Sequence, residues 1–567
     1  MQELSKSQKA RIAIRTFKIL ADSMTLQGSY RPSGRIGEKL AEALKQLSPE
    51  IYGSMSDNRV VELQGLQYVF DRMPKGIERC TRITLTAQED FHDTSFARIV
   101  PLKRRRVSYA VSEKEYCFVI TTGKSEIYDI LTHITFLNIE AWKIYRQVSS
   151  RGDGVSSEWS ELERVVTQEG APEGEELERA LWNLSIILGR TYKETRDAYE
   201  YLERNRLEHD SNSSLFEIIY GIGRRVMDEQ REKRNELVVY FTPSLHEMID
   251  HQSHAALWAT RLRQTLRRLE YEKRPIHIVS ANMHSMRNLI YGPGALAEID
   301  HKVPEDLYAM VRAVRDRDRE VEEYAQRHGF TYLADTSGST IDVNIIDLAQ
   351  LHGCPLHPAL GIDCEMLVIS RPLLLVIDYA FGTQAFDIMD ELLHPEENNG
   401  AEQSLEIASI SIMGKAGVLP GKKGDIMLAT AHVMEGTADN YIVANDLSAA
   451  DFDSGVTVFT GPMVTVLGTS LQNRDVLQRF HTSSWRAIGL EMEGGHYQKA
   501  ISGAIIQGHI PANMKTRYAY YASDNPLQSG QTLASGPMGD EGIVPTYMIS
   551  KVILEKIVAH EYAQRPA

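Results

Sequence analysis

The spacing of apolar residues predicts two differently built halves. Near the start of the chain, apolar positions follow helical spacing and indicate a helix with one buried face: Ala10, Ala13, Phe17, Leu20, Ala21 and Met24. Helical patterns recur as far as residue 235. Within this stretch, β-branched and aromatic residues at 106–110 and 116–121 flank a polar turn and predict a β-hairpin. We therefore expect residues 1–235 to form a mainly helical N-terminal domain.

From Glu236 onward, short apolar runs alternate with helical patterns. The runs that predict strands are Leu237–Phe241, Ile276–Ser280, Met366–Ile369, Leu373–Asp378, Ile407–Met413, Ile426–Ala431, Met463–Leu467, Ala487–Met492 and Arg517–Ala522. A helix is predicted over Pro304–Gly329, where arginines alternate with acids as on an exposed surface. Near-continuous apolar strands between helices are typical of a parallel sheet covered on both faces. We expect residues 236–567 to form an α/β domain with a mixed, mostly parallel sheet.

Composition and charge narrow the class of protein. The chain has 567 residues, of which 43% are hydrophobic and 25% charged, so its cores need no metal or disulfide. A formal net charge of -15 argues against nucleic acid or an anionic membrane as the main partner. The four cysteines show neither a CxxC motif nor zinc spacing, and no signal core or membrane-length apolar run occurs. We expect a cytoplasmic protein without a metal or redox cofactor.

Glycine-containing segments follow two of the predicted strands. Ligands bind at the carboxyl ends of strands in open α/β sheets, where glycine lets backbone N–H groups face an anion or a sugar hydroxyl. Taken singly, each segment is better explained as a tight turn between elements of the sheet. The candidate ligand-binding residues in them are Gly382, Thr383, Gln384, Gly414, Lys415 and Gly417.

Two acidic residues also lie at strand ends. Glu493 belongs to Glu491-Met492-Glu493-Gly494, and Asp524 follows Ser523 directly. N-glycoside cleavage needs an acid that protonates the leaving base and a carboxylate that holds the sugar. From the spacing alone, a catalytic pair and two acids that merely cap turns are equally good interpretations.

These segments, in this order, resemble the nucleoside phosphorylase/nucleosidase superfamily. Glu491–Gly494 is similar to its (D/E)-M-E-(S/A/G) signature, Ser523-Asp524 to its Ser-Asp signature, and 414–425 to its glycine segment. The run Ser523-Asp524-Asn525-Pro526-Leu527 resembles the AMP nucleosidases in particular. The resemblance covers about residues 370–560 and implies a sheet of nucleoside-phosphorylase type. Val418 and Tyr520 depart from positions where many relatives have Gly and Arg.

The resemblance also implies roles for residues. Asp524 would protonate N7 of a departing purine, and Glu493 would bind the ribose hydroxyls, with Met492 packed against the sugar or base. Both acids would be catalytic. The substrate-binding positions would further include Glu491, Ser523, the glycine segments named above, the hydroxyls of Thr469 and Ser470, and, for phosphate or the attacking water, Asn282, His284 and Ser285.

The function expected from this resemblance is hydrolysis of a purine nucleotide or nucleoside, such as AMP to adenine and ribose 5-phosphate. One alternative is phosphorolysis, with phosphate in place of water. Another is a nucleotide-sensing protein without turnover, which the bulky His496 and Tyr497 favour. The expected partners are a small purine ligand, phosphate in the phosphorolytic case, and further copies of the chain in a homo-oligomer. No cofactor is implied.

Overall fold

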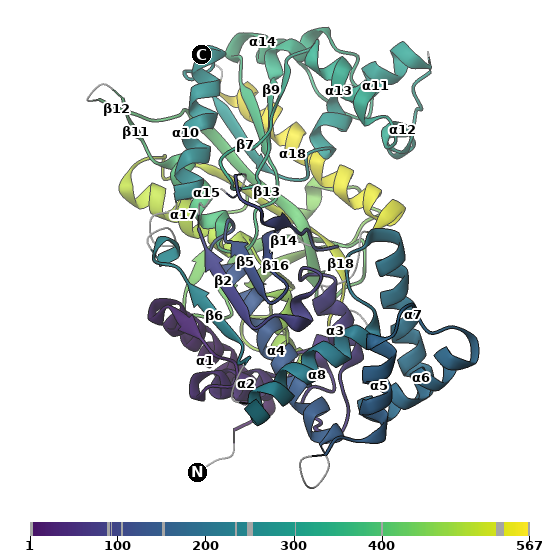
Figure 1. Ribbon diagram of the computed structural model, residues 1–567. Helices are drawn as coiled ribbons and strands as arrows, with labels where there is room; N and C mark the ends of the chain where they lie inside the picture. Colours follow the sequence, from purple (N-terminus) through teal and green to yellow (C-terminus); the bar gives the residue numbers. More distant parts are fainter. Residues whose placement is uncertain are drawn as a thin grey trace. The chain divides into compact units, whose positions relative to one another are not determined.

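The computed structural model describes two compact units of the chain (Figure 1). The described residues are 4–87, 91, 93–103, 106–149, 154–232, 235–246, 253–300, 302–398, 401–528 and 538–564. The first unit comprises residues 1–251 together with 470–476, and the second comprises 252–469 and 477–567. Helix α16 (Arg474–Thr482) therefore begins in the first unit and ends in the second. No helix among the described residues is long and apolar enough to cross a membrane.

The first unit combines helices with a six-stranded sheet, of which the sequence predicted only the hairpin and the strand at 237–241. Its helices are α1 (Lys6–Gln27), α2 (Arg35–Leu47), α3 (Leu63–Phe70), α4 (Lys124–Val148), α5 (Ser157–Thr167), α6 (Gly174–Leu188), α7 (Tyr192–His209) and α8 (Leu215–Glu232). Its strands are β1 (Ser29–Tyr30), β2 (Arg82–Thr86), β3 (Ala97–Arg98), β4 (Val107–Ser112), β5 (Glu115–Val119) and β6 (Val238–Phe241). They form one sheet in the order β1-β6-β2-β5-β4-β3.

The predicted hairpin is confirmed as the antiparallel pair of β4 and β5. Strand β2 pairs in parallel with both β5 and β6. The strand predicted at 237–241 therefore belongs to the first unit and not to the sheet of the second. Strands as short as β1 and β3 carry too few residues to show an alternating pattern, so they left no signal in the sequence.

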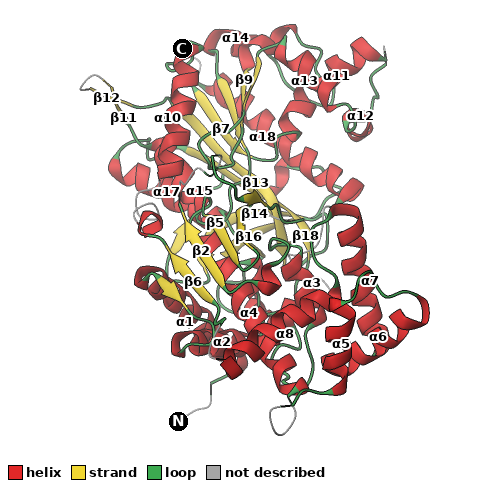
Figure 2. Cartoon of the chain, in the orientation of Figure 1, coloured by secondary structure: helices red, strands yellow, loops and turns green. Residues whose placement is uncertain are grey.

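The second unit is a mixed α/β structure (Figure 2). Apart from α16, its helices are α10 (Ser253–Arg268), α11 (Ser285–Ile299), α12 (Leu307–Val314), α13 (Asp318–Gln326), α14 (Glu365–Ser370), α15 (Gln384–Leu393), α17 (Gly494–Gln507) and α18 (Ile543–Ala563). Its strands are β7 (Ile276–Ser280), β8 (Phe330–Leu333), β9 (Val343–Asp347), β10 (Leu373–Ile377), β11 (Glu396–Asn398), β12 (Ala401–Gln403), β13 (Ile407–Val418), β14 (Ile426–Met434), β15 (Asn440–Ile442), β16 (Val458–Thr465), β17 (Gly489–Glu491) and β18 (Lys515–Asp524).

Ten of these strands form the main sheet, in the order β15-β14-β16-β17-β13-β7-β10-β9-β8, with β18 between β13 and β14. Strands β10, β7, β13 and β18 are neighbours and run parallel. Strand β17 pairs with both β13 and β16, so the ladders through β18, β14, β16 and β17 close on themselves like a small barrel. Antiparallel pairs are as numerous as parallel ones among the described strands, although the longest ladders are parallel, so the sheet is mixed. A strand that is buried on both faces is apolar whether it runs parallel or antiparallel to its neighbours. The apolar pattern therefore did not distinguish parallel from antiparallel strands.

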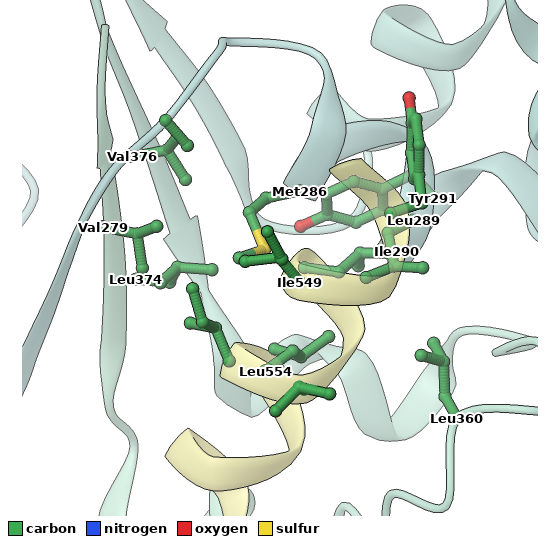
Figure 3. Packing of buried hydrophobic residues seen from close by; sticks show 14 of the residues in the cluster. Val279, Met286, Leu289, Ile290, Tyr291, Leu360, Leu374, Val376, Ile549 and Leu554 are labelled. Carbon is green, nitrogen blue, oxygen red and sulfur yellow. The ribbon is translucent and has the colours of Figure 1, made fainter. Parts of the chain in front are cut away.

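Alternate residues of the strands pack into two cores, one on each face of the sheet. In β10, Leu374 and Val376 belong to the core under α11, α12, α13 and α18. Leu373, Leu375 and Ile377 belong to the other core, under α10, α15 and α17. Figure 3 shows part of the first core, where Ile549 and Leu554 of α18 meet α11 and the strands. Both helix layers thereby hold the four parallel strands in place.

Two predicted elements of this unit were wrong. Residues 366–369 form helix α14 and not a strand, because a short apolar run does not distinguish the two by periodicity. The helix predicted over 304–329 is broken into α12 and α13 at Arg315–Arg317. Arg315 lies in this break, and its side chain is exposed.

Candidate active site

The four parallel strands end at the same edge of the sheet and bring several predicted residues there. Asn282 follows β7, the segment 382–384 follows β10, and Lys415 lies near the end of β13. Asp524 is the last residue of β18 and pairs with Gly417 after a bulge at Ser523 in β18. Loops at the carboxyl edge of parallel strands are the usual position of ligand sites in α/β proteins.

Asp524 is a buried carboxyl group at this edge. Its residue is 1% exposed, Oδ1 accepts a hydrogen bond from Ser523 Oγ, and Oδ2 is buried without a hydrogen-bond partner among the described residues. Burial raises the pKa of Asp524, and the hydrogen bond from Ser523 and the charge of Lys415 oppose that shift only in part. These surroundings favour the protonated form of Asp524 more than water does, and a protonated carboxyl can donate a hydrogen bond to a ligand.

Glu493 lies in the turn between β17 and α17. Its Oε1 accepts a hydrogen bond of 3.0 Å from the backbone N–H of Gly382, in the loop after β10. Gly382 has a φ of 56°, in the left-handed region that glycine adopts without strain. Met492, beside Glu493, is 8% exposed. The contact joins two of the segments that the sequence analysis had singled out.

A cavity of about 380 Å³ lies in the second unit. Of the predicted residues, Asn282, His284 and Lys415 line it, whereas neither Asp524 nor Glu493 does. The polar lining residues that sequence reasoning missed are Asn288, Arg315, Asp318, Tyr521, Thr546 and Tyr547. Most of these lie on helices α11, α13 and α18, whose patterns indicated only which face is buried. The alternating charges around Arg315 indicated a solvated surface.

The lining of this cavity carries two basic side chains, Arg315 and Lys415, and one acidic side chain, Asp318. Arg315 forms an ion pair with Asp540, and Asp318 is paired with Arg287 at 2.5 Å. Lys415 faces the cavity, and loss of hydration lowers the pKa of its ammonium group. Gly542 and Ile543 place the N-terminus of α18, the positive end of its dipole, at the lining. These groups suit an anionic ligand.

His284 contacts Tyr547 at the cavity. Its Nδ1 lies 3.1 Å from the hydroxyl of Tyr547, and Asn288 Nδ2 donates to the same hydroxyl at 3.4 Å. Burial lowers the pKa of His284, with smaller contributions from nearby charges. The imidazole and the tyrosine therefore offer hydrogen-bonding groups to the cavity.

Several other predicted residues are engaged within the protein. The backbone N–H of Ser285 donates to Asn282 Oδ1 at 2.8 Å, and Gln384 Nε2 donates to the carbonyl of Ser339 at 2.6 Å. Thr383 is the residue before α15. Ser470 lies in the first unit, where its buried Oγ donates to Asp129 at 3.2 Å, and Thr469 is the last residue before that segment. In the described part of the chain, no three His, Cys, Asp or Glu residues are grouped to hold a metal.

Comparison with known proteins identifies the family. The model of a family of unknown function, DUF6909, matches residues 38–301 and 301–559. The chain belongs to this family. No curated protein matches the sequence of this DUF6909 member.

Solved structures give a weaker likeness. A 5′-methylthioadenosine/S-adenosyl homocysteine nucleosidase of Campylobacter jejuni is 11% identical, with a TM-score of 0.30 over 50% of this chain and 99% of that one. A futalosine hydrolase mutant of Helicobacter pylori is 11% identical, with a TM-score of 0.29 over 50% and 98%. A uridine phosphorylase of Schistosoma mansoni in complex with thymine is 11% identical, with a TM-score of 0.30 over 51% and 88%. Similarity at this level does not establish a function for the DUF6909 chain.

Proposed function

We propose that the chain hydrolyses the N-glycosidic bond of a purine nucleotide or nucleoside, as an AMP nucleosidase does. The observation that carries the proposal is Asp524, a buried carboxyl at the carboxyl edge of four parallel strands, with a raised pKa and an unpartnered Oδ2. A carboxylic acid that stays protonated near neutral pH is the group that a departing purine base requires.

In the proposed reaction, Asp524 donates its proton to N7 of the purine as the bond between the base and C1′ breaks. The bonding electrons leave with the base, and the sugar develops oxocarbenium character. Glu493 holds the ribose hydroxyls, and its carboxylate is placed by the N–H of Gly382. Water attacks C1′, and its released proton restores the acid. The products are the free base and the sugar or sugar phosphate.

The cationic cavity supports a substrate that carries a 5′-phosphate. Lys415 and Arg315 provide positive charge, and the N-terminus of α18 adds backbone N–H groups. Helix N-termini and basic side chains together bind phosphate groups. The same cavity favours a second candidate, phosphorolysis, in which inorganic phosphate enters and replaces water as the nucleophile.

The test is chromatography of AMP, adenosine, inosine, GMP and methylthioadenosine after incubation with the protein, with and without added phosphate. Release of free base without phosphate supports hydrolysis, and release only with phosphate supports phosphorolysis. If folded protein releases no base from any of these five compounds, the proposed catalytic function is wrong. Thermal stabilisation by one of these compounds would then support the sensing alternative.

We predict that Lys415→Met lowers kcat/KM for AMP by about tenfold to a hundredfold, because a hydrogen bond to a charged group is worth about 1.5–3 kcal/mol. Cleavage of adenosine, which lacks the phosphate, should change by less than about threefold. Lys422→Met is the control, because Lys422 does not line the cavity. Equal losses for AMP and adenosine would show that Lys415 does not bind the phosphate.

A further inference from the structure

Glu491 is fully engaged by the protein, although the family resemblance had suggested a contact with substrate. Its side chain is 1% exposed. Oε1 accepts hydrogen bonds from His432 Nδ1, at 3.2 Å, and from Thr465 Oγ1. Oε2 accepts from the backbone N–H of Glu493, at 2.6 Å, and from that of Gly494. Four donors occupy the four sites of a carboxylate, so no capacity remains for a ligand.

These bonds keep Glu491 ionised. Burial opposes its ionisation, but the hydrogen bond and charge of His432, and the bonds from Thr465 and Gly494, outweigh burial and lower the pKa of Glu491. The N-terminus of α17 lies directly beside the carboxylate and favours a negative charge there. His432 Nε2 is buried without a hydrogen-bond partner among the described residues.

The two backbone bonds connect Glu491 to Glu493. They fix the turn between β17 and α17, from which the Glu493 side chain reaches Gly382. Thr465 supports the same turn, because its Oγ1 also accepts the N–H of Gly495 at 3.1 Å. A shift of this turn would move the Glu493 carboxylate away from the loop after β10.

We propose that Glu491 is a positioning residue, which holds Glu493 in place through the backbone of the turn and is itself held by His432 and Thr465. The inference rests on the proposed function, since the role of Glu493 toward ribose is part of it. Glu491 touches no substrate, and its effect on catalysis passes through the position of Glu493.

Hydrogen–deuterium exchange of the full chain tests the positioning independently of turnover. The variant is Glu491→Gln, because glutamine has a single acceptor oxygen and cannot hold all four donors. We expect exchange in segments 489–497 and 380–384 to rise by about tenfold as the turn loosens. Glu561→Gln is the matched control: Glu561 is a buried carboxylate bonded to His277 at 3.0 Å, on other elements. It should leave both segments unchanged.

A substrate comparison separates positioning from a loss of stability. AMP carries the ribose hydroxyls that Glu493 is proposed to hold, and 2′,3′-dideoxy-AMP does not. The ratio of kcat/KM for AMP to that for the dideoxy compound should fall about tenfold in Glu491→Gln and stay constant in Glu561→Gln. A general loss of folded enzyme would lower kcat/KM for both substrates by the same factor and leave their ratio unchanged.

The outcomes distinguish the two proposals. Unchanged exchange in 380–384 in Glu491→Gln, or the same change in Glu561→Gln, overturns the positioning role. If the wild-type chain releases no base, the proposed function fails, and exchange still decides whether Glu491 positions Glu493. Should Glu491→Gln not fold, Thr465→Val decides, because it removes one donor to Glu491 and the acceptor of the Gly495 N–H. It must raise exchange in both segments.

Discussion

Asp524→Asn is expected to lower the rate of base release by about a thousandfold, within the range that general acid catalysis contributes. The asparagine amide has the shape of the protonated acid, and its oxygen can still accept the hydrogen bond from Ser523. The variant should therefore fold and bind AMP with nearly unchanged affinity. Chromatographic rates at saturating AMP, together with calorimetric affinity, measure the two quantities separately.

The same carboxyl predicts the pH dependence of activity. Because burial raises the pKa of Asp524, the acid keeps its proton to a higher pH than an ordinary aspartate. The wild-type rate should be flat below this raised pKa and fall about tenfold per pH unit above it. The folded state also holds this proton more tightly than the unfolded state, so ionisation of Asp524 at higher pH lowers stability. Asp524→Asn should lack that loss.

Asp300→Asn serves as the control for both measurements, because Asp300 forms an exposed ion pair with Arg317. It should leave the rate and its pH profile as in the wild type. A variant Asp524→Asn that releases base at the wild-type rate would show that another group protonates the leaving base.

The place of Asp524 at the end of a strand was predictable, because the strands on which it depends have a clear apolar pattern. The apolar runs at 373–378, 407–413 and 517–522 read correctly as strands β10, β13 and β18. Parallel neighbours end at one edge, so the residues after them come together whatever the details of packing. The positions of polar residues at strand ends can therefore be predicted from the strands alone. The helices that cover the sheet need not be known.

The lining of the cavity was not predictable in this way. Arg315 reaches it from the break between α12 and α13, whereas Asp318 and Tyr547 reach it from α13 and α18. All three depend on how the helices pack on one face of the sheet. A helical pattern tells which side is buried but not which partner that side meets. Ser470 shows the reverse case, because its segment belongs to the first unit although the sequence on both sides of it belongs to the second. A short segment that packs with a distant part of the chain leaves no signal in its own sequence.

Gly494→Ala is expected to destabilise the chain by about 3 kcal/mol, at the upper end of the cost of overpacking a core. A Cβ at this position would clash with the hydroxyl of Tyr520 and with the ring of His432. Both side chains are buried, so neither has room to withdraw. Denaturant unfolding monitored by circular dichroism measures the loss. Because the clash displaces the turn that carries Glu493, kcat/KM for AMP should also fall, by about a hundredfold.

Gly503→Ala is the matched change in the same helix, and it should have the opposite sign. A Cβ at Gly503 meets no atom within 4 Å, and alanine is the better helix former by up to about 1 kcal/mol. This variant should gain stability and keep its activity. If Gly494→Ala were as stable and as active as Gly503→Ala, the turn before α17 would not be held as closely against β14 and β18 as these contacts require. Glu493 would then have to be placed by Gly382 alone.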